Sequence, residues 1–160
     1  MTNTSKDDLR KRFWRDIEAA RTGMLGVSEG EEGRFQPMTP HFDDQSGTFW
    51  FFARTTSPLV DAAERGSVAT FTYTATGRDL FACVRGWLAT EADPEVRRKF
   101  WTQDVARWFP AGPDSDEVAL LRFEGDSAQV WVPEDSMDAA SMSFGAQRSA
   151  PQDIHGSVSL

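Results

Sequence analysis

Residues 48–73, TFWFFARTTSPLVDAAERGSVATFTY, predict a strand, a polar turn, a short helix and a second strand. The first six residues, 48–53, are apolar on both alternating faces, which favours a central strand. Ser57 is suited to cap the helix and Pro58 to open it, because the first helical position does not use its N–H as a donor. Gly66 is placed to end the helix. The β-branched and aromatic residues that follow are typical of a strand.

The polar turn places one fixed positive charge and three hydroxyl groups at the start of the predicted helix. The charge belongs to Arg54 and the hydroxyls to Thr55, Thr56 and Ser57. The first N–H groups of a helix have no partner within the helix, and the helix dipole adds to their attraction for anions. These residues therefore suit a phosphate group. Serine and threonine at a helix start also act as caps alone, so both interpretations stay open at this point.

The composition is that of one globular domain. The 160-residue chain is 39% hydrophobic and 26% charged, and its formal net charge of −8 argues against nucleic-acid binding through a broad basic surface. No run of about 18 apolar residues is present, so no membrane-spanning helix is expected. The N-terminus lacks the apolar core of a signal peptide, and the single cysteine, Cys83, excludes an internal disulfide. We therefore expect a cytoplasmic protein.

The remaining sequence predicts a small, mostly antiparallel β-barrel with three short helices on its outside. Beyond residues 48–73, helices are expected at 5–20 and from Asp93 to Trp108. Further strands are expected at 24–28, 35–42, 80–90, 118–124 and 128–132.

Particular residues refine this outline. Pro37 and Pro40 place their strand at a margin of the sheet, and Gly86 marks a bulge in a long strand. The last two strands are expected to form a hairpin around Gly125-Asp126. We expect residues 1–132 to form the domain and residues 133–160 a C-terminal tail, either loosely ordered or packed on a partner subunit.

No familiar set of catalytic side chains is evident. His41 and His155 are the only histidines, and neither has a partner at metal-ligand spacing, so no metal site is expected. The sequence holds no GxGxxG and no P-loop. Cys83 lies in a strand pattern and fits a small core residue better than a nucleophile. If the protein catalyses a reaction, we expect a cofactor to carry it.

Four features carry a family resemblance: the PM after the turn at Gly33, WFFARTTSP before the short helix, a glycine in the long strand, and WFPAGPDSDEVALLRF late in the chain. Together they resemble the general-stress-protein branch of the pyridoxamine 5′-phosphate oxidase-like proteins. The resemblance covers about residues 13–131, and the ending APQDIHGSVSL extends it. Members are split β-barrels that dimerise and hold flavin mononucleotide (FMN) at the subunit interface. The resemblance thus implies a mostly β split barrel of six or seven antiparallel strands with flanking helices, a homodimer and FMN.

The resemblance also implies which residues hold the flavin. Residues 36–39 would run beside the ring, residues 52–54 would pass under the ribityl chain, and residues 55–57 would approach the phosphate. Trp108 would come across from the other subunit and cover the pocket. The implied set is Gln36, Pro37, Met38, Thr39, Phe52, Ala53, Arg54, Thr55, Thr56, Ser57 and Trp108.

Two positions depart from the family pattern. Many members have a basic residue where this chain has Gln36, and many have a lysine where it has Leu59. Both replacements remove positive charge from the region where a flavin would need it. Losing one charge-assisted phosphate contact costs about 1.5–3 kcal/mol, or about ten- to a hundredfold in affinity. Arg54, or Arg78 from the next turn, is the candidate to compensate.

The sequence therefore predicts an FMN-binding stress-type protein, and as an enzyme a flavin-dependent oxidoreductase with a nicotinamide donor. The alternative is a non-catalytic protein of the same fold that binds flavin or another small ligand. A further alternative is an interaction module with an empty pocket.

Overall fold

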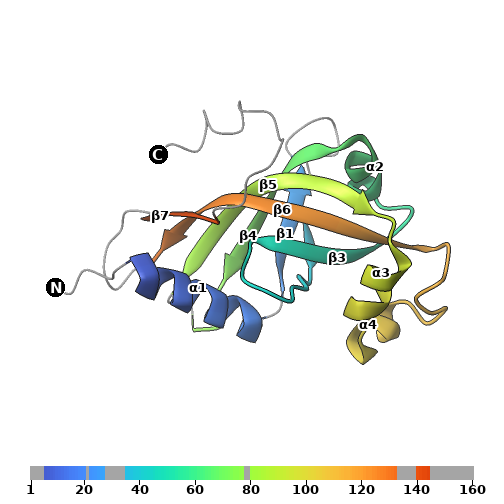
Figure 1. The fold of residues 1–160 in the computed structure, drawn as a ribbon, viewed down its shortest axis with the longest axis horizontal. Helices are drawn as coiled ribbons and strands as arrows, with labels where there is room; N and C mark the ends of the chain where they lie inside the picture. The colour runs from blue at the N-terminus through green and yellow to red at the C-terminus, as the bar shows by residue number, and fades with distance from the viewer. Residues whose placement is uncertain (1–5, 21, 28–34, 78–79, 133–139, 145–160) are drawn as a thin grey trace.

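A computed structural model describes residues 6–20, 22–27, 35–77, 80–132 and 140–144. In this part of the chain, one antiparallel sheet of seven strands curls into a half-barrel, and four short helices pack around it (Figure 1). The elements in chain order are α1 (Lys6–Ala20), β1 (Gly23–Val27), β2 (Gln36–Met38), β3 (Thr48–Arg54), α2 (Pro58–Arg65), β4 (Ser67–Thr74), β5 (Phe81–Glu91), α3 (Pro94–Phe100), α4 (Gln103–Trp108), β6 (Val118–Trp131) and β7 (Ala140–Ser143). The predicted split-barrel fold is confirmed.

The strand order leaves β2 and β3 at the two ends of the sheet. The order is β2-β1-β4-β5-β6-β3. Strand β7 lies off this path and pairs with the part of β6 that extends past the end of β3. The prediction of β3 as a central strand is therefore wrong. One isolated bridge, between His41 and Trp50, joins β3 to the segment that follows β2. The strand is apolar on both faces because Phe49 and Phe51 pack in the main core, whereas Phe52 packs in a second cluster with Phe100 of α3.

The two longest strands, β5 and β6, form the back of the half-barrel. Their register shifts between Arg85 and Gly86, which confirms the predicted bulge. A Cβ atom on Gly86 would lie 2.2 Å from the carbonyl oxygen of Glu124, so only glycine allows this close approach. The predicted hairpin at Gly125-Asp126 is wrong, because β6 runs unbroken through these residues. One half of β6 pairs with β3 and the other half with β7, and this pairing overrides the local turn signal.

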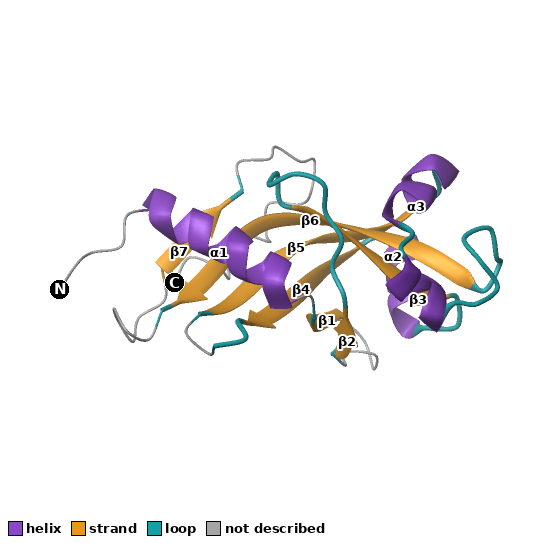
Figure 2. Ribbon diagram, turned by 90° about the horizontal axis from the view of Figure 1, so that it is seen from below, coloured by secondary structure: helices purple, strands orange, loops and turns teal. Residues whose placement is uncertain are grey.

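Helix α1 runs across one side of the sheet and supplies much of the core (Figure 2). Phe13 and Trp14 are fully buried, and the Trp14 ring lies 5.5 Å from Phe49 and 5.9 Å from Phe144. Phe144 follows β7, so the described part of the predicted tail lies in the same sheet and core as the rest of the domain. The other residues of that tail lie outside the described residues.

The other helices begin and end at identifiable caps. Ser57 caps α2 through a bond from the Leu59 N–H, and Gly66 ends it with a φ of 75°, both as predicted. Asp93 caps α3 as predicted. The single helix expected up to Trp108 is wrong, however, because the Thr102 side chain accepts the Val105 N–H and starts α4 as a separate helix. Among the described residues, no helix is long and apolar enough to cross a membrane.

Candidate functional site

A cavity of about 610 Å³ lies where β2, β3, the start of α2 and α4 meet. This volume falls within the range of about 300–1,000 Å³ that is typical of small-molecule sites. The lining residues are Thr22, Gln36, Pro37, Met38, Thr39, His41, Phe52, Ala53, Arg54, Thr56, Ser57, Pro58, Asp104, Val105, Trp108 and Phe109. The cavity therefore lies between the two end strands of the sheet, where the barrel is split.

The structure brings ten of the eleven implied site residues together around this cavity. The exception is Thr55, whose backbone N–H donates to the Glu117 carbonyl at 3.0 Å and whose exposed side chain does not line the cavity. Contact of the ten residues with a flavin stays a prediction. The lining residues that sequence reasoning missed are Thr22, His41, Pro58, Asp104, Val105 and Phe109. Val105 and Asp104 could have been found from Trp108, since residues three and four positions apart share one face of a helix.

The polar end of the cavity is built around the Ser57 hydroxyl. Its Oγ accepts hydrogen bonds from the Leu59 N–H at 3.2 Å and from the Gln36 side-chain amide at 3.0 Å. A hydroxyl has two acceptor lone pairs and one donor hydrogen, and both acceptors are used here. The hydroxyl hydrogen is therefore available to donate to a ligand. Arg54 and Thr56, from the same turn as Ser57, add a guanidinium and a second hydroxyl to the cavity lining.

Arg54 also ties the end of β3 to α4. Its Nη2 donates to the Trp108 carbonyl at 3.1 Å, and its guanidinium carbon lies 5.4 Å from the centre of the Phe109 ring. Trp108, with 73% of its surface exposed, lines the cavity of its own chain. The expectation that Trp108 of a second subunit covers the pocket stays a prediction.

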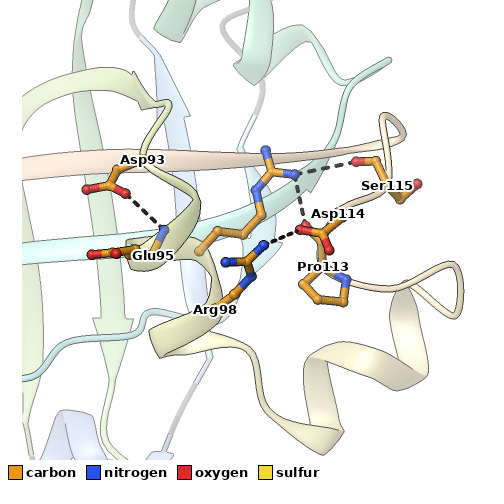
Figure 3. A network of polar contacts seen from close by, with 7 residues as sticks. Asp93, Glu95, Arg98, Pro113, Asp114 and Ser115 are labelled. Carbon is orange, nitrogen blue, oxygen red and sulfur yellow. Dashed lines mark hydrogen bonds and ion pairs between the residues drawn. The ribbon is translucent and has the colours of Figure 1, made fainter.

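The loop between α4 and β6 is fastened to α3. Arg97 donates to the carbonyl oxygens of Pro113 at 3.0 Å and Ser115 at 3.4 Å, and Arg98 pairs with Asp114 at 3.4 Å (Figure 3). These contacts hold together α3 and the loop that follows α4 in the chain.

The other side chains that line the cavity are apolar, except those of Thr22, Thr39, His41 and Asp104. Met38, Phe52, Val105 and Phe109 line it. The Phe52 ring is held edge-on by Trp101, with ring centres 5.3 Å apart, and His41 lies edge-on at 5.5 Å. Aromatic and apolar side chains of this kind favour contact with another ring.

The family model "Pyridoxamine 5'-phosphate oxidase like" matches residues 8–150 of the chain. The chain belongs to the pyridoxamine 5′-phosphate oxidase-like family. No curated protein matches it. A general stress family protein of Xanthomonas campestris pv. campestris is 33% identical with a TM-score of 0.75, over 88% of this chain and 96% of that one. A general stress FMN/FAD binding protein of Xanthomonas citri is 33% identical with a TM-score of 0.74, over 84% and 95%. General stress protein 26 of Jannaschia sp. CCS1 is 27% identical with a TM-score of 0.75, over 88% and 100%.

The two departures from the family pattern have different consequences in the structure. Gln36 lines the cavity, so its neutral side chain stands where many members of the family have a charge. Leu59 is 3% exposed and packs in the main core, so this position gives no side chain to the cavity. The expected loss of cavity charge at Leu59 is therefore wrong. Arg78 lies outside the described residues.

Two groups with a shifted pKa lie away from the cavity. Hydrogen bonds from Ser46 lower the pKa of Asp44 in the loop before β3. Burial raises the pKa of the Cys83 thiol on β5, although the nearby Arg85 partly opposes this shift. Among the described residues, no group of three or more His, Cys, Asp or Glu side chains is placed to hold a metal ion.

Proposed function

We propose that the cavity binds FMN, with the flavin ring against the apolar wall and the phosphate at the turn before α2. The supporting observation is that ten of the residues implied for the flavin come from three separate segments of the chain and surround one cavity. The FMN/FAD binding relative from Xanthomonas citri, which is 33% identical, also supports this proposal.

The groups that the chain presents fit both ends of such a ligand. Met38, Phe52 and Val105 offer an apolar surface to a planar ring. At the other end, the hydroxyl of Ser57 and the guanidinium of Arg54 are hydrogen-bond donors for a phosphate. The cavity thus has one apolar and one donor-rich end.

Two adjacent threonines allow a matched test of this location. Thr56 lines the cavity and Thr55 does not, although both are exposed and belong to the same turn. Thr56→Trp should weaken FMN binding by at least about tenfold, because the new ring would fill part of the cavity. Thr55→Trp should leave the affinity close to that of the unaltered protein. Titration with FMN, followed by flavin fluorescence, measures both, and an equal loss in the two variants would contradict the proposed location.

We further propose that the protein is a flavin-dependent oxidoreductase with a nicotinamide donor. Bound FMN supplies the electron-transfer chemistry, and the chain's residues bind the ring, orient it and exclude water. The test is steady-state oxidation of NADH or NADPH by the protein with and without FMN. Consumption that requires bound FMN supports the enzyme.

A non-catalytic flavin-binding protein is the second candidate. It is favoured by the shortage of reactive groups, since the titratable side chains that line the described cavity are His41, Arg54 and Asp104, and Arg54 is engaged with Trp108. FMN binding without any oxidation of NADH or NADPH would select this candidate.

We also propose a homodimer in the cytoplasm. The strand register places Met24, Phe81 and Trp131 on the outer face of the sheet, where Met24 is 38% and Phe81 36% exposed. Exposed apolar side chains on one sheet face favour a contact with a second subunit. Light scattering after gel filtration tests the dimer, and a monomer mass at micromolar concentration would contradict it.

A further inference from the structure

We infer that the cavity selects its ligand by the flavin ring and discriminates only weakly for the phosphate, and that Gln36 sets this preference. The inference rests on the proposed flavin site. It concerns which part of the ligand provides the affinity. Gln36 acts through Ser57 as a positioning residue and does not itself bind the phosphate.

The phosphate end has little positive charge. Arg54 is the only lysine or arginine among the described residues that line the cavity. Its side chain is exposed, and one of its donors is already bonded to the Trp108 carbonyl. Contacts between exposed charges are weak because water and salt screen them. Asp61, in the first turn of α2, adds a negative charge beside the same helix start.

Gln36 shapes this end with a neutral group. Its amide lies 3.0 Å from Ser57 Oγ, so a basic side chain at this position would bring its charge to the same place. The amide instead occupies an acceptor lone pair of Ser57, which leaves the hydroxyl hydrogen for the ligand. Neutral hydrogen bonds are about half as strong as charge-assisted ones. The phosphate would therefore bind to the oriented hydroxyl of Ser57. A basic side chain at position 36 would bind it more tightly.

The experiment compares FMN with riboflavin, which carries the same ring without the phosphate. We expect the unaltered protein to bind FMN less than about tenfold more tightly than riboflavin, since the described cavity lining offers the phosphate one cation, the exposed Arg54. Gln36→Lys should raise the preference for FMN over riboflavin about ten- to a hundredfold, because the new charge would act on the phosphate alone. Gln36→Met, which keeps the length and loses the amide, should lower that preference severalfold.

The salt dependence provides a second measurement that needs no variant. Between 50 and 500 mM salt, FMN affinity in the unaltered protein should fall by less than about threefold, because screening acts on a single weak ionic contact. Far-UV circular dichroism checks that both Gln36 variants are folded.

The outcomes separate this inference from the proposal on which it rests. If neither flavin binds, the proposed flavin site is wrong and the inference falls with it. If both bind but FMN is favoured more than about tenfold, the site stands and the weak phosphate selectivity is wrong. If folded Gln36→Lys protein leaves FMN affinity unchanged, the role of Gln36 is refuted.

Discussion

Replacing Phe144 with alanine tests whether the C-terminal strand belongs to the folded domain. The side chain is 7% exposed, and its ring centre lies 5.9 Å from those of Phe13 and Trp14 and 6.4 Å from that of Phe49. Removing a buried phenylalanine ring costs about 3–5 kcal/mol of unfolding free energy. Phe144 lies at the margin of the core, where neighbours can partly fill the space, so we expect the lower end of this range, about 3 kcal/mol. For a domain of this size, that corresponds to a melting temperature lower by about 6–12 °C.

Urea unfolding followed by far-UV circular dichroism, at one fixed protein concentration, measures this loss. Phe35→Ala is the matched control, because Phe35 is 45% exposed and we expect a loss near 1 kcal/mol. A loss from Phe144→Ala below about 1 kcal/mol, or no larger than that of the control, would refute the contribution of residues 140–144 to the core.

Three further predictions concern single residues. Gly86→Ala should lower the unfolding free energy by about 1–3 kcal/mol or more, since its Cβ would meet the Glu124 carbonyl oxygen at 2.2 Å; an unchanged urea midpoint would contradict the bulge geometry. Ser57→Ala should lose about 0.5–2 kcal/mol through the missing α2 cap and also weaken FMN binding, whereas Ser57→Thr should keep most of both. Burial raises the pKa of Cys83, so at pH 8 iodoacetamide should alkylate the folded protein more slowly than the urea-unfolded chain, and the rate should rise as the pH approaches the raised pKa; equal rates would show an accessible thiolate.

Local chemistry accounts for the features that could be predicted from the sequence. The start of α2 follows from Ser57 and Pro58, and its end follows from Gly66, because each residue acts through its own backbone and cap geometry. The bulge at Gly86 was predictable for the same reason, since only glycine permits the close strand approach.

The features that sequence reasoning missed depend on contacts between distant segments. The continuation of β6 through Gly125 depends on its pairing with β5, β3 and β7. The position of β3 at the end of the sheet could not be predicted from its apolar pattern, because α3 and α4 cover its second face as another layer would.

In the candidate site, too, local features could be predicted from the sequence, and features that depend on distant contacts could not. The turn at Arg54–Ser57 was identified from its residue types, but the structure was needed to separate Thr56, which lines the cavity, from Thr55, which does not. No sequence pattern indicated that Arg54 would hold the Trp108 carbonyl.

The most direct test of the flavin site is the visible absorbance spectrum of the freshly purified protein, combined with mass spectrometry of whatever heat releases. We predict a flavin spectrum, with the mass of FMN or riboflavin in the released material, or uptake of added FMN if the flavin is lost during purification. A colourless protein that also fails to take up added FMN would contradict the account, and the split barrel would then serve a different ligand.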